Sequence, residues 1–263
     1  MGIARSSEAG RIGGVLASDS MKAMTGLILL ALGLPASAVE VGMAFGEKIP
    51  PFCFPLTNSG IELEVIGEAL AYRGHTLKPS YYPFARVPVA FKEGWVDATM
   101  TDLGKDLGKF GGFYGDPAVL YDNVFLTLKS RGLSIRTPAD LEGLSVVAFS
   151  GAVNRFPAWL EPVRKAHRYT ELNDQALQVK TLMLGRYDVV LSDRSIFKYF
   201  SLQLKHEGFA VKPVDEHSFA TVNPMDYRPV FRDKQVRDDF NAGLKQLKET
   251  GRYKAIYERY LRD

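Results

Sequence analysis

The feature that most constrains the fold is a short pattern that occurs twice, at 94–102 and at 185–193. Each copy reads Gly, any residue, apolar, Asp, apolar, any residue, apolar, hydroxyl, Asp. The apolar middle of the second copy indicates a buried strand that ends at Ser192 and Asp193, and a helix is expected directly afterwards, at 195–207. A carboxylate at the carboxyl end of such a strand faces the ligand crevice of an α/β sheet. The repeated helix-turn-strand unit therefore predicts two similar lobes that face each other.

Strand and helix patterns alternate along the rest of the chain, and both halves have the order β-α-β-α-β. This order indicates a doubly wound, mostly parallel sheet in each half. A strand at 123–129 is long enough to cross between the lobes, and one at 219–222 should return the chain to the first lobe. The other expected strands are 39–45, 76–82, 144–149, 169–172 and 209–214, and the expected helices are 61–72, 85–92, 152–166, 174–184, 234–249 and 252–261.

The predicted fold class is α/β, with two doubly wound sheets joined by two crossing strands. Lobe 1 is expected to comprise 39–127 and 220–263, and lobe 2 is expected to comprise 128–219. Because the chain crosses twice, lobe 1 is not continuous in the sequence.

Residues 1–38 are interpreted as an upstream extension followed by a secretory signal peptide. A cationic start at Met21 and Lys22 precedes an apolar stretch at 25–34, and Ala-Ser-Ala follows at 36–38. The stretch is too short to span a bilayer comfortably, and a buried helix is the weaker alternative. Met21 is a better start than Met1. Cleavage after residue 38 is expected to release the mature chain into the periplasm.

The composition argues against several classes of function. The 263 residues are 46% hydrophobic and 24% charged, which is ordinary for a globular protein. A net charge of +3 without a basic run argues against nucleic acid as a partner. The 4 histidines lack metal-ligand spacing and no nucleotide-binding motif is present, so neither a metal nor a cofactor is expected. Cys53 is the only cysteine and is expected to pack as a small hydrophobe.

Four stretches carry a resemblance to a known family. They are Pro-Pro-Phe at 50–52 with Gly-Ile-Glu-Leu at 60–63, Phe-Lys-Glu-Gly-Trp-Val-Asp-Ala at 91–98, the segment 137–147, and the C-terminal pattern at 240–257. In this order and spacing they resemble the bacterial extracellular solute-binding proteins of family 3, the periplasmic amino-acid-type binding proteins of ABC importers. The resemblance implies the two-lobed periplasmic binding protein fold (type II), whose lobes close over a ligand by a hinge motion.

The resemblance also implies a small polar, amino-acid-like ligand and an inner-membrane ABC permease as partners, with binding rather than catalysis as the function. A monomer is expected. Two alternatives use the same scaffold. In a periplasmic dehydratase-like enzyme, carboxylates in the cleft do acid–base work. In a sensory partner, closure of the cleft signals to a membrane receptor.

Four residues of the repeated pattern and its surroundings are implied as ligand groups. Asp193 falls where the family has its ammonium-binding acid, although an Asp at that point also suits a helix cap. Thr99 and Thr101 keep the family's hydroxyl pair. Lys109 falls where the family has a carboxylate-binding Arg, and it lacks the guanidinium fork. Lys109 is therefore expected either to bind an anionic group or to be a solvated loop residue.

Gly151 and Ala152 open a helix after a strand, where free backbone N–H groups suit an oxyanion. An ordinary capped helix start is the alternative. One or two aromatic residues are expected to form a wall of the site, because most aromatics are simply core. Arg86 is a second basic candidate, or a surface residue. The aromatic candidates are Phe52, Phe54, Tyr81, Tyr82 and Phe84.

Overall fold

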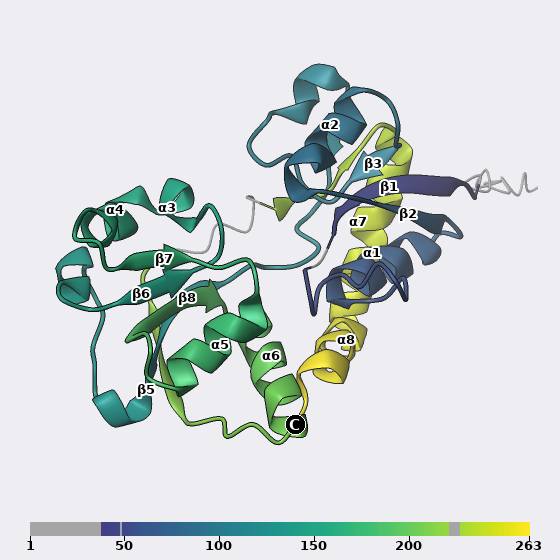
Figure 1. Ribbon diagram of the computed structural model, residues 1–263. Coiled ribbons are helices and arrows are strands. Elements are labelled where there is room, and N and C mark those ends of the chain that lie inside the picture. Colours follow the sequence, from purple (N-terminus) through teal and green to yellow (C-terminus); the bar gives the residue numbers. More distant parts are fainter. Residues whose placement is uncertain (1–37, 48, 221–226) are drawn as a thin grey trace, which may run out of the picture. The chain divides into compact units, whose positions relative to one another are not determined.

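The computed structural model of the chain describes residues 38–47, 49–220 and 227–263, so the predicted extension and signal peptide, except Ala38, lie outside the described residues. Two five-stranded sheets form the frame, and helices flank both of them (Figure 1). This arrangement confirms the predicted α/β class with two sheets. None of the helices in the described ranges is long and apolar enough to cross a membrane.

The first sheet has the strand order β2-β1-β3-β10-β4. β1 pairs in parallel with β2 and β3, while β10 is antiparallel to β3 and β4. The strands are β1 (Glu40–Gly46), β2 (Thr76–Tyr82), β3 (Ala98–Thr99), β4 (Phe113–Tyr114) and β10 (Val230–Phe231), and the helices beside them are α1 (Ile61–Ala71), α2 (Val87–Lys92), α7 (Lys234–Glu249) and α8 (Arg252–Leu261).

The second sheet has the strand order β7-β6-β8-β5-β9. β6 pairs in parallel with β7 and β8, while β5 is antiparallel to β8 and β9. The strands are β5 (Asn123–Leu128), β6 (Val146–Ala148), β7 (Tyr169–Glu171), β8 (Val189–Asp193) and β9 (Val214–Ser218), and the helices are α3 (Ala152–Arg155), α4 (Pro157–Lys165), α5 (Gln175–Met183) and α6 (Arg194–His206).

The expectation of mostly parallel sheets is wrong for half of the pairings. In each sheet one strand, β10 or β5, pairs antiparallel with both of its neighbours. β5 pairs with β8 and β9, so the strand expected to cross at 127/128 lies inside the second sheet. The division into lobes 39–127 with 220–263 and 128–219 stays a prediction, and this pairing favours a first crossing before Asn123.

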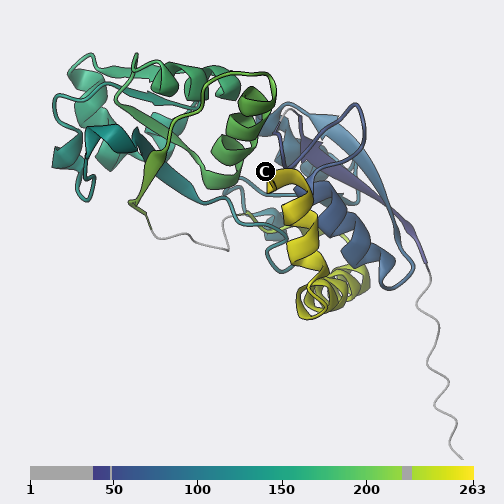
Figure 2. The same ribbon diagram turned by 90° about the horizontal axis from the view of Figure 1, so that it is seen from below.

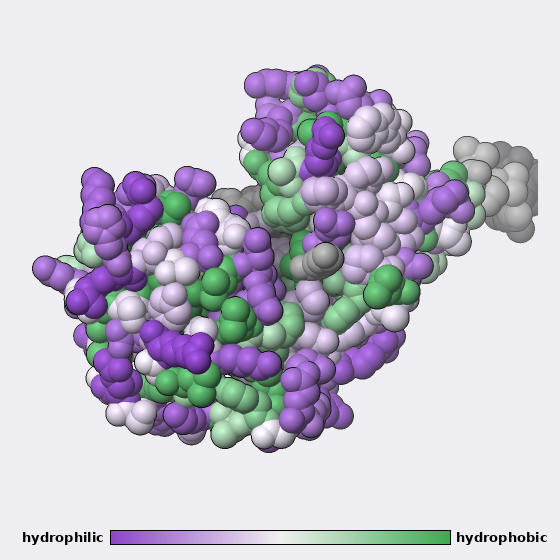
Figure 3. Space-filling model, in the orientation of Figure 1, coloured by the Kyte–Doolittle hydropathy of each residue, from purple (hydrophilic) through white to green (hydrophobic). Residues whose placement is uncertain are grey.

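The apolar periodicity of the helices correctly predicts which faces are buried. Leu63, Ile66 and Leu70 of α1 lie in one core cluster with Phe240 and Leu244 of α7. Figure 2 shows α7 and α8, in yellow, beside α1, in blue. Cys53 is fully buried in the same cluster, as expected for a lone cysteine that packs as a small hydrophobe. On the face seen in Figure 3, hydrophilic side chains predominate and apolar residues form small scattered groups.

The packing of α1 against α7 depends on a glycine. A Cβ atom at Gly243 would lie 1.9 Å from the carbonyl oxygen of Ala69, which is backbone and cannot rotate away. We therefore expect Gly243→Ala to destabilise the protein by about 2–4 kcal/mol, because the helices must move apart. Urea unfolding measures this change.

The matched control is Gly67→Ala, in the middle of α1. A Cβ there would lie 3.6 Å from Leu77 Cδ2, an ordinary contact. Because alanine favours a helix by about 0.5–1 kcal/mol over glycine, this variant should be as stable as the parent or slightly more stable. Equal free energies of unfolding for the two variants would contradict the close approach at Gly243.

Candidate functional site

A cavity of about 290 Å³ lies at the carboxyl ends of parallel strands from both sheets. Glu47 and Ile49 follow β1, Phe84 follows β2, and Asp193 ends β8. The carboxyl ends of such strands are where open α/β sheets bind ligands, so this cavity is the candidate site. The other lining residues are Tyr121, Asn123, Phe149, Ser150, Leu172, Asn173, Gln175, Ile196 and Tyr227.

A larger cavity, of about 340 Å³, lies at the opposite end of β1. Its buried polar pair is His75 with Asp239, whose Nε2 and Oδ2 atoms are 3.0 Å apart. The Val39 N–H donates to the other ring nitrogen of His75 at 3.3 Å. These groups satisfy one another, and the cavity lies at the amino ends of the strands. We therefore place the candidate site in the smaller cavity.

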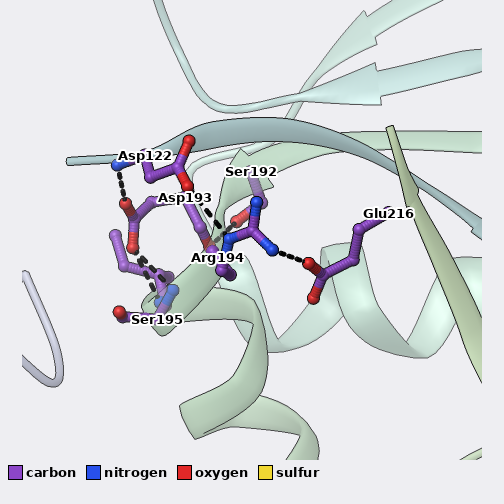
Figure 4. A network of polar contacts seen from close by, with 7 residues as sticks. Asp122, Ser192, Asp193, Arg194, Ser195 and Glu216 are labelled. Atoms are coloured by element: carbon purple, nitrogen blue, oxygen red, sulfur yellow. Dashed lines mark hydrogen bonds and ion pairs between the residues drawn. The ribbon is translucent and has the colours of Figure 1, made fainter. Parts of the chain in front are cut away.

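Asp193 is only 3% exposed and is held by three backbone N–H groups. Its Oδ1 accepts from Ser195 and Ile196 at 2.9 and 3.0 Å, so it caps α6, and its Oδ2 accepts from Asp122 at 2.7 Å (Figure 4). Burial raises the pKa of Asp193 to about 7, although these hydrogen bonds act in the opposite direction. The helix-cap role is thus present, and the carboxyl also lines the cavity.

Arg194 does not neutralise Asp193, although it is the next residue. Its guanidinium lies toward Asp122, with Nε 3.0 Å from Oδ2, and toward Glu216 of β9 (Figure 4). Asp122 therefore contacts β8 through its backbone N–H and α6 through its side chain, and Arg194 extends these contacts to β9. The sequence analysis missed Asp122, because its place beside Asp193 follows only from the antiparallel register of β5 with β8.

The residues predicted to bind an anionic group do not lie together around this cavity. Lys109 lies in the turn Leu107–Phe110, its side chain is 78% exposed, and its Nζ is 3.2 Å from Asp106 Oδ2. Thr99 Oγ1 donates to the Thr101 carbonyl at 3.1 Å, and Thr101 Oγ1 accepts from the Leu103 N–H at 3.2 Å. Both threonines are fully buried, and the described residues that line the cavity include none of these three.

The helix start at Gly151 and Ala152 holds an internal carboxylate. Glu171 of β7 accepts from the Gly151 N–H at 2.8 Å and from the Val153 N–H at 3.3 Å, and the Tyr169 hydroxyl donates to it at 2.6 Å. Burial alone would raise the pKa of Glu171, but these hydrogen bonds outweigh it and lower the pKa. The N–H groups expected to bind a ligand oxyanion are therefore already paired.

Of the aromatic and second basic candidates, Phe84 is the one that lines the cavity. Phe52 is fully buried in the core, where its ring packs 4.4 Å from that of Tyr121. Tyr82 stacks on Trp95 at 6.4 Å. Arg86 is exposed, at the end of the turn Phe84–Arg86. The aromatic wall instead comes from residues that sequence reasoning missed, namely Tyr121, Phe149 and Tyr227.

A second buried carboxyl lies behind this wall. Glu62 of α1 is fully buried, and the Tyr121 hydroxyl donates to its Oε2 at 3.0 Å. Glu62 Oε1 has no hydrogen-bond partner among the described residues. Burial raises the pKa of Glu62 to about 8, and the hydrogen bond from Tyr121 opposes that shift only in part.

Solved structures of known proteins identify the fold. No protein-family model and no curated protein matches the sequence. Among solved structures, an L-arginine-bound substrate-binding protein of an amino-acid ABC transporter from Streptococcus pneumoniae is 18% identical, with a TM-score of 0.60 over 84% of this chain and 93% of that chain. The second substrate-binding domain of Lactococcus lactis GlnP, in an open conformation, is 21% identical, with a TM-score of 0.61 over 87% and 97%.

A histidine kinase sensor domain with similarity to periplasmic binding proteins is 18% identical, with a TM-score of 0.58 over 87% of this chain and 97% of that chain. Similarity to solved structures at 18–21% sequence identity shows a shared fold only. The chain therefore has the two-lobed α/β fold of the substrate-binding proteins of amino-acid ABC transporters.

Proposed function

We propose that this protein is a solute-binding protein that captures a small polar, amino-acid-like ligand and delivers it to an inner-membrane ABC permease. The observation that carries the proposal is the cavity at the carboxyl ends of strands from both sheets, with the buried carboxyl of Asp193 in its lining. The Streptococcus and Lactococcus proteins share the fold and are described as a substrate-binding protein and a substrate-binding domain, which supports the proposal. We further propose residues 1–38 as an extension and signal peptide, which places the mature chain in the periplasm.

Two measurements on the exported protein test this function. A thermal-shift screen against amino acids, amines, polyamines and organic acids should identify a ligand that raises the melting temperature, because a ligand that binds only the folded state stabilises it by mass action. Small-angle scattering with that ligand at saturation should show a smaller radius of gyration, since the proposed lobes close by a hinge. A radius that stays constant would count against closure, and a screen without any stabilising solute would count against the binding function.

A ligand-sensing role is the second candidate. The histidine kinase sensor domain shows that this fold also occurs in signalling proteins. A sensor-kinase gene beside the coding gene would favour signalling, whereas a permease gene would favour transport. A dehydratase-like reaction is the remaining alternative, and turnover of the bound ligand, followed by mass spectrometry, would select it.

A further inference from the structure

We infer that the cavity selects a small organic cation without a carboxylate, such as an alkylamine, a diamine or an alkylguanidine. This ligand class rests on the proposed binding function and narrows it. It has two bases. The described charged residues that line the cavity are acidic, and the residues predicted to bind a carboxylate already pair with other residues of the protein.

Among the described residues that line the cavity, the charged groups are all acidic. Asp193 and Glu47 contribute carboxylates, and no Lys, Arg or His occurs among the described lining residues. The neutral polar groups are the Ser150 hydroxyl, the hydroxyls of two tyrosines and the amides of Asn123, Asn173 and Gln175. An amino acid brings an ammonium and a carboxylate into the site, and each needs a partner of opposite charge when it is buried. The described lining residues offer such a partner to the ammonium alone.

Asp193 has room for a cation. A carboxylate offers about four lone-pair positions, and three of those of Asp193 accept from neutral backbone N–H groups. Arg194 is engaged by Asp122 and Glu216, so its charge is directed elsewhere (Figure 4). A ligand ammonium or guanidinium would donate to the remaining position and provide the positive charge that the buried carboxylate of Asp193 lacks as a partner.

Movement of the lobes does not by itself separate the predicted anion-binding positions from their internal partners. Glu171 belongs to β7, which pairs directly with β6, the strand before Gly151. Lys109 and Asp106 belong to one turn. Each pair lies within a single sheet and its own loops, so rotation of one sheet against the other leaves both pairs intact.

The aromatic wall suits the same ligand class. Phe84, Phe149, Tyr121 and Tyr227 line the cavity, and the faces of such rings attract ammonium and guanidinium groups. Arg155 touches this wall from outside the lining. It stacks over the Tyr227 ring at 4.7 Å and hydrogen-bonds the Tyr227 hydroxyl, so a carboxylate would compete with that engagement.

Calorimetry with matched pairs that differ only in a carboxylate tests the inference on the exported protein. The pairs are agmatine with arginine, cadaverine with lysine, and putrescine with ornithine. We expect at least one amine to bind about tenfold or more tightly than its amino acid, because the added carboxylate is buried without a cationic partner. Equal or tighter binding of the amino acid in every pair would overturn the inference.

Three variants test for a hidden carboxylate partner. They are Arg155→Gln, Lys109→Gln and Lys48→Gln, the last at a position outside the described residues. Each should change the affinity of the bound amine by less than about twofold. A selective loss of amino-acid affinity in any of them would identify a carboxylate partner and overturn the inference. Binding of neutral or anionic solutes without any amine would also overturn it while leaving the binding function intact, whereas failure of every solute would contradict that function itself.

Discussion

The Asp193→Asn variant should bind the tightest amine about 2–5 kcal/mol more weakly than the parent protein, because the ligand cation is then buried without its partner charge. The fold should survive. Asparagine caps helices about as well as aspartate, so the N–H groups of Ser195 and Ile196 keep an acceptor. The Asp122 N–H loses its acceptor, which should lower the free energy of unfolding by about 1–2 kcal/mol. Calorimetry and urea unfolding separate the two effects.

Asp233→Asn is the matched control. Asp233 caps α7 with the same geometry, accepting from the N–H groups two and three residues later, and it lies outside the candidate site. This variant should leave amine affinity unchanged. Asp193 is a helix cap without a ligand role if the affinity of Asp193→Asn for the amine is unchanged. The same holds if its free energy of unfolding falls by as much as its binding free energy.

The same carboxyl should make amine binding depend on pH. Because burial raises the pKa of Asp193 to about 7, the unliganded protein binds a proton there at lower pH. A cation needs the ionised form, so affinity should rise by about tenfold per pH unit from pH 5 to 7 and level off above. The neighbouring charges are Asp122 and Arg194, which pair with each other. Asp193→Asn should remove the slope, and proton release measured in buffers of different ionisation enthalpy checks its origin.

The second large effect concerns stability. Burial raises the pKa of Glu62 to about 8, so its folded-state pKa lies above its unfolded value of 4.5. The stability that this group contributes is therefore fully present below about pH 4.5 and is lost as the pH rises through about 8. Glu62→Gln cannot ionise and keeps a hydrogen-bonding group beside Tyr121. At pH 9 we expect the variant to be more stable than the parent by roughly 2–4 kcal/mol.

Urea unfolding at pH 5, 7 and 9 measures how the stability difference between Glu62→Gln and the parent changes with pH. Glu68→Gln serves as the control, because Glu68 on the same helix pairs with Arg252 at the surface, with 2.6 Å between Oε1 and Nη2. Loss of such a surface pair should cost at most about 1 kcal/mol, with little change between pH 7 and 9. A parent protein equally stable at pH 7 and pH 9 would show that Glu62 does not ionise in this range.

The repeated pattern predicted the two sheets and one residue that lines the candidate cavity, and the ligand role of that residue stays a prediction. Asp193 was predicted from local information, since a buried strand, a hydroxyl residue and a terminal acid are consecutive in the sequence. The fold class followed from the alternation of strand and helix patterns, and the buried faces of α1 and α7 followed from their periodicity. Each of these inferences depends on residues that are close together in the chain.

The polar partners of these groups were not predictable, because long-range pairing determines them. Glu171 reaches the helix start at Gly151 only because β7 lies beside β6, and Asp122 reaches Asp193 only because β5 runs antiparallel to β8. Lys109 was placed by its position in a family pattern, but its turn directs the side chain to Asp106 and solvent. A single sequence contains no direct record of such pairings.

Two neighbouring residues just before β5 are hydrogen-bonded to different parts of the fold. The Tyr121 side chain is bonded to Glu62 of α1, beside the first sheet, and the Asp122 backbone is bonded to Asp193 of the second. Between these anchors the backbone has only a few rotatable bonds. If the proposed lobes close by a hinge, the backbone torsion at this crossing would have to occur in that short link. Tyr121 also lines the candidate cavity, so a solute bound there would contact this link directly.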